Sequence, residues 1–175
     1  MAAELDDPPQ PDRALRSFDG FYRREYREVV GLVYALSGSR IAAEDIAQDA
    51  FVAAHKRWEQ VGRYDKPEAW VRRVAANLAV SAFRTRGREA AALARLKPRN
   101  SYLPPMPDED ADFWKAVRSL PRRQSQVIAL HYLEDRPVAD IAEILGCAEA
   151  TVRVHLYNGR AGLSRRLGIS PEEQP

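Results

Sequence analysis

The chain has 175 residues, of which 45% are hydrophobic, and this is enough for a packed core in one domain or in two small ones. Its 27 Lys and Arg residues against 25 Asp and Glu residues give a net charge of only +2, so the overall charge indicates no particular partner. The single cysteine, Cys147, excludes an internal disulfide and a zinc site built from cysteines, and no apolar run reaches the roughly 20 residues of a membrane span. These features favour a reducing, cytoplasmic location.

Helical spacing of apolar residues dominates the chain, and no segment shows the alternation of a strand. Residues 1–12 are acidic and proline-rich, so we expect a disordered lead-in, and we expect the same of the tail, residues 169–175. Residues 13–94 form one helical block. Residues 95–112 hold four prolines and end in an acidic cluster, which predicts a linker. A second helical block, residues 113–168, follows, so the expected fold is all-α, with two small domains joined by a Pro-rich acidic linker.

The first informative segment is AEDIAQDAFVAAHKRW, residues 43–58. Its helical period places Ile46, Ala50 and Ala53 on the inward face. Apolar residues among polar ones on the outward side indicate a protein-docking surface, unless another helix of the same domain covers Phe51. The outward side holds Glu44, Asp45, Gln48, Phe51, Val52 and His55, with Asp49 beside them.

Residues 64–89 predict a basic helix with an apolar stripe of Trp70, Val71, Val74, Leu78 and Ala82. Aromatic residues are interleaved with arginines where this helix begins. That mixture suits a nucleic acid with partly unstacked bases, because rings stack on bases while guanidinium groups hold phosphates. The alternative is a solvated basic helix with Trp70 in the core. The residues that would face nucleic acid are Arg63, Tyr64, Arg72, Arg73, Arg84, Arg86 and Arg88.

The second block contains a predicted helix-turn-helix. Val138, Ile141, Ala142 and Leu145 form one apolar stripe, and Gly146 suits the residue just past a helix end. A new helix is expected to begin near Glu149, where a negative residue suits the helix dipole. Two helices joined by a short turn that contains glycine describe this motif, whose second helix enters the major groove of DNA.

The second helix of this motif has two distinct faces. Val152, Leu156, Gly159 and Leu163 share the face that should pack inward. Small and polar residues on the other face allow close approach to base edges, although an ordinary αα-hairpin with a solvated basic face remains the alternative. For His155, packing and DNA contact are equally open. The outward residues are Ala150, Thr151, Arg153, Val154, Tyr157, Asn158 and Ala161.

Taken together and in this order, these segments resemble the extracytoplasmic-function (ECF) class of bacterial sigma factors. AEDIAQDAF resembles the region-two helix that docks on the clamp helices of the RNA polymerase β′ subunit. WVRRVAANLAVSAFRTRGR resembles the part that melts and reads the −10 promoter element, and LPRRQSQVIALHYLEDRPVADIAEILGCAEATVRVHLYNGRAGL resembles region four, which reads the −35 element. The resemblance implies core RNA polymerase, including the β flap, and promoter DNA as partners, with an anti-sigma factor as a possible third. It implies no cofactor and no small-molecule substrate.

The resemblance also assigns residues. It places Asp45, Gln48, Asp49, Phe51 and His55 on the polymerase-facing surface. It places Asn77 near a flipped −10 base, with Arg63, Tyr64, Arg72, Arg73, Arg84 and Arg86 on the same −10 surface. Arg153 falls on a −35 contact position, and the −35 set is Glu149, Ala150, Thr151, Arg153, Val154, His155, Tyr157 and Asn158.

Other classes of protein fit less well. A transcription regulator with a LuxR-like output domain is the alternative, because ATVRVH resembles that family's pattern, but its receiver domain needs alternating strands and helices. His55, His131 and His155 lack metal-site spacing, and the chain contains no GxGxxG, P-loop or GxSxG motif, so the sequence indicates no enzyme. Two helical interaction modules that do not bind DNA remain the third possibility.

Overall fold

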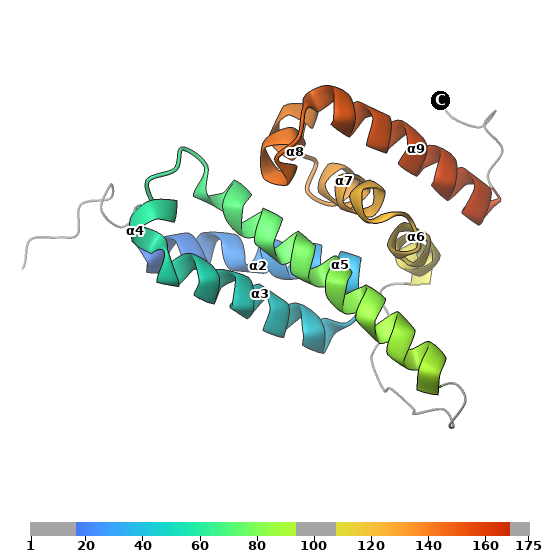
Figure 1. The fold of residues 1–175 in the computed structure, drawn as a ribbon, viewed down its shortest axis with the longest axis horizontal. Helices are drawn as coiled ribbons and strands as arrows, with labels where there is room; N and C mark the ends of the chain where they lie inside the picture. The colour runs from blue at the N-terminus through green and yellow to red at the C-terminus, as the bar shows by residue number, and fades with distance from the viewer. Residues whose placement is uncertain (1–16, 94–107, 169–175) are drawn as a thin grey trace, which may run out of the picture.

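The structure, a computed structural model, describes residues 17–93 and 108–168, and within these ranges every regular element is an α-helix (Figure 1). This confirms the expected all-α fold. The helices are α2 (Phe18–Ser37), α3 (Arg40–Lys56), α4 (Trp58–Val61), α5 (Pro67–Leu93), α6 (Asp108–Arg118), α7 (Arg122–Tyr132), α8 (Val138–Leu145) and α9 (Glu149–Leu167). The lead-in, most of the linker and the tail predicted from sequence lie outside the described residues.

Helix α2 is the centre of the N-terminal domain. It begins at the cap residue Ser17, whose hydroxyl accepts a hydrogen bond from the Gly20 amide at 3.1 Å, and it ends at Gly38, which has the left-handed φ of 70°. Its buried stripe recurs at helical spacing and includes Phe21, Val29 and Leu36. Because this stripe is wide, α2 can pack against both α3 and α5.

Helix α3 lies on α2 and α5 through an alanine face. Ala43, Ala47, Ala50 and Ala54 are fully buried there, and such small side chains let the helices approach closely. Of the three residues expected to point inward, Ala50 is buried, whereas Ile46 and Ala53 are half-buried. The buried face is therefore rotated from the predicted one toward the alanines.

The expected apolar stripe of α5 is also rotated. The buried positions are Val71, Ala75, Ala76, Ala79 and Val80, together with Ala69 and Arg72, whereas Leu78 is exposed and Trp70, Val74 and Ala82 are half-buried. Packing of the small residues against α2 and α3 decides the orientation, since a close helix contact buries more atoms than a contact held apart by large side chains. Trp70, expected in the core, packs at its edge.

The C-terminal domain begins earlier than its sequence suggested. Helix α6 starts at Asp108, so the acidic run at the end of the expected linker forms the first turns of a helix. Carboxylates at a helix N-terminus are favoured by the helix dipole, and this explains why the cluster is helical despite the prolines before it. Helices α7 and α9 cross closely at Gly159, where a Cβ atom would lie 2.9 Å from Cγ1 of the buried Ile128.

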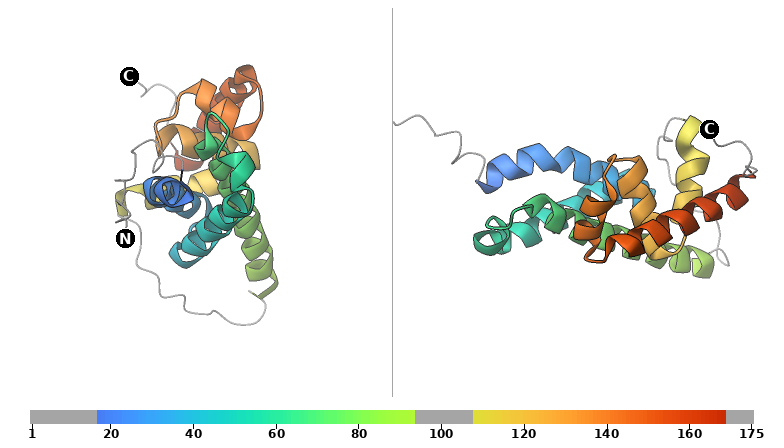
Figure 2. Two further views of the ribbon diagram at one scale, coloured as in Figure 1. Left: turned by 90° about the vertical axis from the view of Figure 1, so that its left-hand side faces the viewer. Right: turned by 90° about the horizontal axis from the view of Figure 1, so that it is seen from above.

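The two domains pack against one another. Figure 2 shows the C-terminal helices stacked on the layer formed by α2, α3 and α5. The contacts run from α2 to α6 and α7, and from α5 to α7 and α8, and the buried apolar residues of both domains form one continuous cluster. No helix of the described ranges is long and apolar enough to cross a membrane.

Candidate nucleic-acid interface

The turn between α8 and α9 holds the two helices of the predicted helix-turn-helix rigidly. Gly146 has φ 64°, and the amides of Cys147 and Gly146 donate to the carbonyls of Ala142 at 3.0 Å and Glu143 at 3.3 Å. This is the Schellman arrangement, which uses a left-handed glycine to satisfy the last carbonyls of a helix. The prediction of a helix-turn-helix around Gly146 is confirmed.

Helix α9 has the two faces expected from its sequence. Val152, Leu156, Gly159 and Leu163 are buried, as predicted. The opposite face is open over the first three turns, and its Tyr157 side chain is 75% exposed. The other exposed members of the predicted −35 set are Glu149, Ala150, Thr151, Arg153, Val154 and Asn158, and His155 is half-buried.

Arg153 is held in place from within its own helix. Its Nη2 atom donates to the Glu149 carboxylate at 2.8 Å, and both side chains are solvent-exposed. An exposed pair at this spacing contributes only about 0.3–0.5 kcal/mol, so a stronger acceptor can replace Glu149. Phosphate and the guanine edge are acceptors of that kind. Arg153 is therefore exposed on the open face of α9 and held there only by a weak pair.

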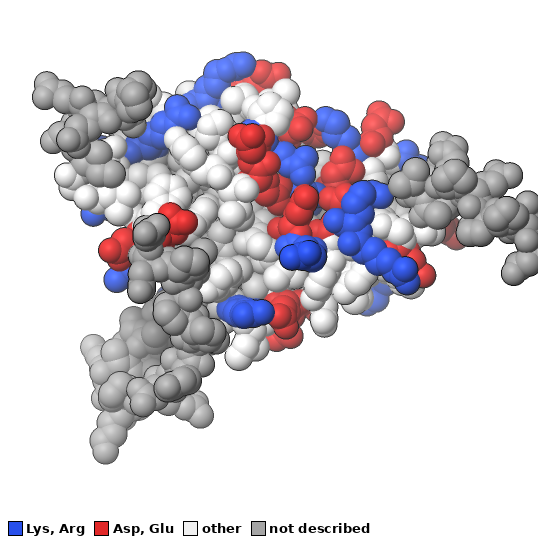
Figure 3. Space-filling view, turned by 180° about the vertical axis from the view of Figure 1, so that it is seen from behind, with Lys and Arg blue, Asp and Glu red and all other residues white. Residues whose placement is uncertain are grey.

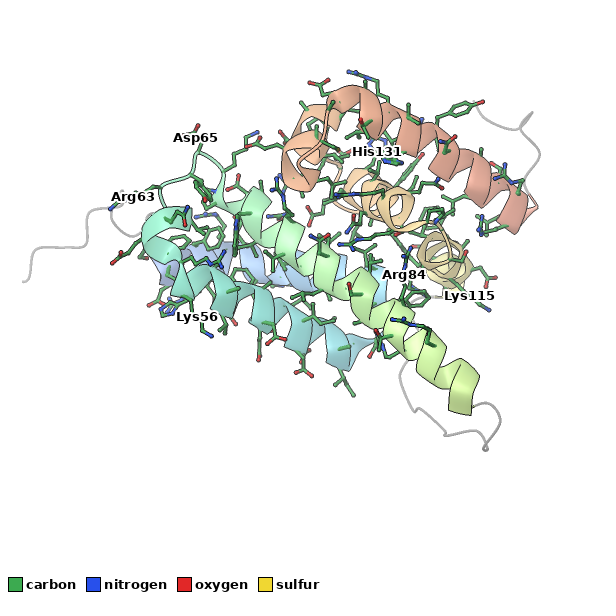
Figure 4. The ribbon with its side chains drawn as sticks, in the orientation of Figure 1. Lys56, Arg63, Asp65, Arg84, Lys115 and His131 are labelled. Atoms are coloured by element: carbon green, nitrogen blue, oxygen red, sulfur yellow. The ribbon has the colours of Figure 1, made fainter. Side chains whose placement is uncertain are left out.

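A second candidate surface surrounds the loop between α4 and α5. A pocket of about 600 Å³ opens there, lined by Arg63, Tyr64, Trp70 and Arg73 among others. Figure 4 shows Arg63 and Asp65 at the outer end of this loop, at the opposite end of α5 from Arg84. The pocket joins aromatic rings with guanidinium groups, the combination that suits a base with its phosphate.

The structure does not bring all of the predicted −10 residues onto one surface. Arg63, Tyr64, Arg73 and Arg84 are exposed, and Asn77 is half-buried. Arg86 is half-buried and donates to the carbonyl of Ser37 at 3.0 Å, where it helps to close the end of α2.

The expectation that Arg72 faces nucleic acid is wrong. Its side chain is 0% exposed, and its three nitrogens bind carboxylates from two other parts of the chain. Nη1 donates to Glu25 at 2.8 Å, Nη2 to Glu28, and Nε to Glu134 at 2.7 Å. Arg72 thus joins α2 and α5 to the loop between α7 and α8.

The electrostatics of this cluster follow from its burial. Burial by itself raises the pKa of Glu25, but hydrogen bonds from Arg72 and Arg24, together with their charges, reverse this and lower it. For Arg72, burial opposes the charged form, whereas Glu134 and Glu25 raise its pKa, so it stays protonated. Oε1 of Glu134 is buried and has no hydrogen-bond partner within the described part of the chain.

The predicted docking surface on α3 needs one correction. Phe51 is only 2% exposed, because it packs against the rings of Phe21, Tyr22 and Tyr26 from α2. Two large apolar side chains of α3 are exposed instead, namely its neighbour Val52, at 51%, and Ile41 in the first turn, at 68%. The remaining predicted residues are exposed, namely Asp45, Gln48, Asp49 and His55.

Three side chains of the predicted −10 region make polar contacts with the C-terminal domain that were not expected from sequence. Lys66 binds both Asp140, at 2.9 Å, and Glu143, at 2.8 Å, and these two hydrogen bonds raise its pKa. Arg73 donates to carbonyls at the end of α8, and Asn77 accepts from α7. Charged residues inside the buried stripes, Glu25 in α2 and Arg72 in α5, are a signal for the Arg72 cluster but not for these three contacts.

The surface charge is otherwise mixed. On the face turned away from the view of Figure 1, acidic and basic side chains alternate without forming a single-sign patch (Figure 3). Within the described ranges, no group of three His, Cys, Asp or Glu residues is placed to hold a metal ion. The face drawn in Figure 3 therefore carries no single-sign field that would by itself attract a nucleic acid.

Comparison with protein families matches both parts of the chain in order. The family model of sigma-70 region 2 matches residues 21–89, and that of sigma-70 region 4 matches residues 110–163. The ECF RNA polymerase sigma factor SigM of Mycobacterium tuberculosis is 30% identical over 159 residues, which cover 87% of this chain and 78% of that protein. The chain belongs to the ECF sigma factors.

Two further ECF sigma factors support this membership. SigW of Bacillus subtilis is 27% identical over 159 residues, covering 80% of this chain and 83% of SigW. SigE of Mycolicibacterium smegmatis is 30% identical over 170 residues, and the match covers 91% of this chain but 65% of SigE. The resemblance read from the sequence motifs is therefore confirmed at the level of the family.

A solved structure has the same fold. It is the sigma factor RpoE in complex with the anti-sigma factor NepR from Bartonella quintana, with a TM-score of 0.68 and 24% sequence identity. The match covers 87% of this chain and 98% of RpoE. The LuxR-like alternative is not favoured, because its receiver domain needs strands and residues 17–93 are described without any.

Proposed function

We propose that this chain is an alternative sigma factor that binds core RNA polymerase in the cytoplasm and directs promoter-specific transcription initiation. The observation that carries the proposal is a helix-turn-helix fixed by Gly146 in which the open face of α9 presents Arg153, Val154 and Tyr157. It occurs in a chain with both sigma-70 regions. The chain provides binding surfaces and carries out no chemical step.

The open face of α9 reads the −35 element in this proposal. The first three turns of α9 enter the major groove, where Arg153 exchanges Glu149 for a guanine edge or a phosphate. Val154 offers methyl groups to a thymine methyl, and Asn158 offers an amide to an adenine edge. The small side chain of Ala150 allows the backbone of α9 to approach the groove.

The surface around the α4–α5 loop captures the −10 element. A base flipped out of the duplex enters the pocket beside Tyr64 and Trp70, while Arg63 and Arg73 hold its phosphates. Extruding a base costs a few kcal/mol of stacking, which ring contacts and charged contacts offset. Asn77, one turn along α5 from Arg73, contacts the strand next to this pocket. Arg72 has no part in this step, because it is buried.

Core polymerase binds the outer face of α3. Asp45, Gln48, Val52 and His55 recur at helical spacing along that face, and an exposed valine among polar residues is typical of a protein-docking surface. The clamp helices of β′ are the proposed partner there, and the β flap is the proposed partner of the C-terminal domain. An anti-sigma factor is a possible further partner, as for the RpoE protein in its complex.

The experiment that tests this division of labour is charge reversal on α9. Arg153→Glu should lower promoter-directed transcription about 10- to 100-fold, since a lost base contact costs about 1–3 kcal/mol and a like charge now faces the DNA. Arg165→Glu is the matched control, because Arg165 is exposed in the last turn of the same helix. Both variants should bind core polymerase as the original chain does. Unchanged transcription with Arg153→Glu would remove α9 as the reader, and equal loss of core binding would show that the two tasks are not separate.

A further inference from the structure

Three polar side chains form a cluster beside the open face of α9. They are Arg160 of α9 and the last two residues of α7, His131 and Tyr132. Arg160 and Tyr132 are exposed and His131 is half-buried, and Figure 4 shows His131 where α7 approaches α9. The cluster borders the −35 set that the family resemblance assigns, but none of its members belongs to that set.

The guanidinium of Arg160 is fixed by uncharged partners. Its Nε donates to the hydroxyl of Tyr132 at 2.8 Å, and its Nη2 lies 3.3 Å from Nε2 of His131. Its Cζ atom is 5.7 Å from the centre of the Tyr132 ring. The ion pairs among the described residues do not include Arg160. The positive charge of Arg160 is therefore held in one direction without being neutralised.

The cluster keeps hydrogen-bond donors for an anion from outside. Because a guanidinium only donates, the Tyr132 oxygen accepts from Arg160, and the hydroxyl hydrogen stays available. For the same reason Nε2 of His131 accepts, and Nδ1, which is 3.4 Å from the carbonyl of Arg136, carries the ring hydrogen. Nη1 of Arg160 makes no hydrogen bond to a described residue. An anion in front of the cluster can take hydrogens from Arg160 and Tyr132 together.

The place of Arg160 on α9 suits the wall of a DNA groove. Arg153, Tyr157 and Arg160 follow one another at i, i+4 and i+7, so they share one side of the helix. At about 1.5 Å per residue, Arg160 lies roughly 10 Å along the axis from Arg153, and the major groove is about 12 Å wide. When Arg153 lies at the base edges, Arg160 therefore reaches the sugar-phosphate backbone at the edge of the groove.

We propose that Arg160 and Tyr132 bind one phosphate of the duplex backbone, and that His131 takes up a proton when this phosphate binds. The inference rests on the reading of DNA by α9 in the proposed function, to which it adds the residues that fix the helix in the groove. The phosphate oxygens accept from Nη1 of Arg160 and from the hydroxyl of Tyr132. A backbone contact of this kind sets the register of a protein on DNA and is the same for every base sequence.

Proton uptake follows from the charges around His131. Histidine ordinarily changes its charge between pH 5 and 8. In the free chain the cation of Arg160 lies against Nε2 and opposes a second cation there. A phosphate between the two side chains removes this repulsion, so the complex with DNA holds the proton more readily than the free chain. The charged groups that neighbouring elements bring to this side are Arg160 of α9 and, from the loop between α7 and α8, Arg136, which is paired with Glu134 and Glu28.

The test measures binding of duplex DNA by the full chain, in which the face of α9 is open. The probe is a fluorescein-labelled duplex of about 20 base pairs with random sequence, since a backbone contact does not depend on sequence. Anisotropy titrations between about 50 and 200 mM salt give the affinity and its salt slope. The variants are Arg160→Gln, Arg160→Lys and Tyr132→Phe. The control is Arg165→Gln, which removes the same charge from an exposed position on another side of α9.

The salt slope decides whether Arg160 meets a phosphate. Arg160→Gln should bind about 5- to 10-fold more weakly at about 100 mM salt, with a slope lower by about 0.9, the value for one phosphate contact. Arg160→Lys should keep the slope but bind more weakly than the original chain, because lysine keeps the charge and lacks the fork. Tyr132→Phe keeps the ring and should weaken binding about 2- to 3-fold at an unchanged slope.

Two results of these titrations would count against the account, and they differ. A slope for Arg160→Gln equal to that for Arg165→Gln would overturn the phosphate site while leaving the reading of DNA by α9 in place. A failure of the original chain to bind the duplex would overturn that reading itself.

The pH profile tests the part assigned to His131. At fixed salt the original chain should bind the duplex about 3- to 10-fold more tightly at pH 6 than at pH 8, because the complex takes up a proton. His131→Gln keeps an acceptor for Arg160 but cannot take up a proton, so its affinity should change less over the same range. His55 and His155 are present in both chains, and their effects cancel in this comparison. Equal profiles for the two chains, or tighter binding at pH 8, would overturn the proton uptake.

Discussion

Replacing Arg72 with methionine, Arg72→Met, tests the buried charge cluster that joins the two domains. Methionine fills much of the volume of the arginine stem, so the change mainly removes charge and hydrogen bonds. The stability that this variant loses is less than the sum of three ion pairs, because Glu28 is 60% exposed and water can solvate its carboxylate once Arg72 is gone. Glu25 and Glu134 have side chains that are largely buried, and they lose Arg72, although Glu25 keeps Arg24 at 2.7 Å and Glu134 keeps Arg136 at 3.2 Å.

Removing one partner of a buried ion pair costs about 3–5 kcal/mol, because the other charge is left without compensation. Because Arg24 and Arg136 still compensate part of the charge, we expect a loss near the lower end of this range, about 3 kcal/mol, at neutral pH. Even this is a large part of the roughly 5–15 kcal/mol that stabilises an ordinary domain. Urea denaturation followed by circular dichroism measures it. The triple variant with methionine at residues 25, 72 and 134 is the control, and it should recover most of the loss because no charge remains buried.

The pH dependence gives this prediction a second readout. In the original chain the pKa of Glu25 is lowered, so its contribution to stability is present above the ordinary glutamate range and is lost as the pH falls through the lowered value. In Arg72→Met the burial of Glu25 remains and raises its pKa, so acid protonates the carboxyl and removes the penalty. The difference in unfolding free energy between the original chain and Arg72→Met should therefore become smaller as the pH is lowered from about 7 to about 4. A loss below about 1 kcal/mol at neutral pH, or a constant difference, would refute a buried and uncompensated charge.

Three further variants test the packing and the docking surface. Gly159→Ala should destabilise the folded chain by about 1–3 kcal/mol relative to Gly31→Ala, as measured by thermal unfolding. Both variants gain helix propensity, but only the new methyl group at residue 159 would clash with the buried Ile128. Gln48→Ala with Val52→Ala should weaken core-polymerase binding by about 1–2 kcal/mol in a titration without lowering stability, and unchanged affinity would remove α3 as the docking surface. Phe51→Ala should lower stability without weakening core-polymerase binding. It leaves a cavity in the aromatic cluster, which should cost about 3–5 kcal/mol of unfolding free energy in urea denaturation. A stability equal to that of the original chain would contradict the burial of Phe51.

The C-terminal motif could be predicted because its signals are local. The stripe of Val138, Ile141 and Leu145, the glycine at residue 146 and the stripe that begins at Val152 each specify a helix or its end without reference to the rest of the chain. Local signals were weaker at α6, where a carboxylate-rich first turn follows several prolines. There, the favourable interaction of the carboxylates with the helix dipole allows the helix to begin directly after the prolines.

The N-terminal faces were harder because α3 and α5 are rich in alanine. An alanine-rich helix offers more than one apolar stripe, and its periodicity favours the stripe with the larger side chains, through Trp70, Val74 and Leu78, as the inner one. Close packing instead selected the small residues, which rotated Arg72 inward. The same effect placed Phe51 under α2 and left Val52 outside.

The closed arrangement of the two domains could not be predicted from periodicity. Its polar contacts join residues far apart in the sequence, such as Lys66 with Asp140, and each of these side chains would be equally normal on a solvated surface. The stripes that the structure buries contain one pair of opposite charges, Glu25 and Arg72, but the periodicity favours a stripe of α5 that leaves Arg72 on the surface. Such a pair indicates a partner but does not identify Glu134 as the third member.

The central claim is that this chain gives core RNA polymerase its choice of promoter. In vitro transcription with purified core enzyme and a genomic promoter library, with and without the chain, tests it most directly. We expect a defined set of transcripts that requires the chain, that shares sequence elements near −35 and −10, and that is lost with Arg153→Glu. Identical transcripts in the presence and absence of the chain would contradict it.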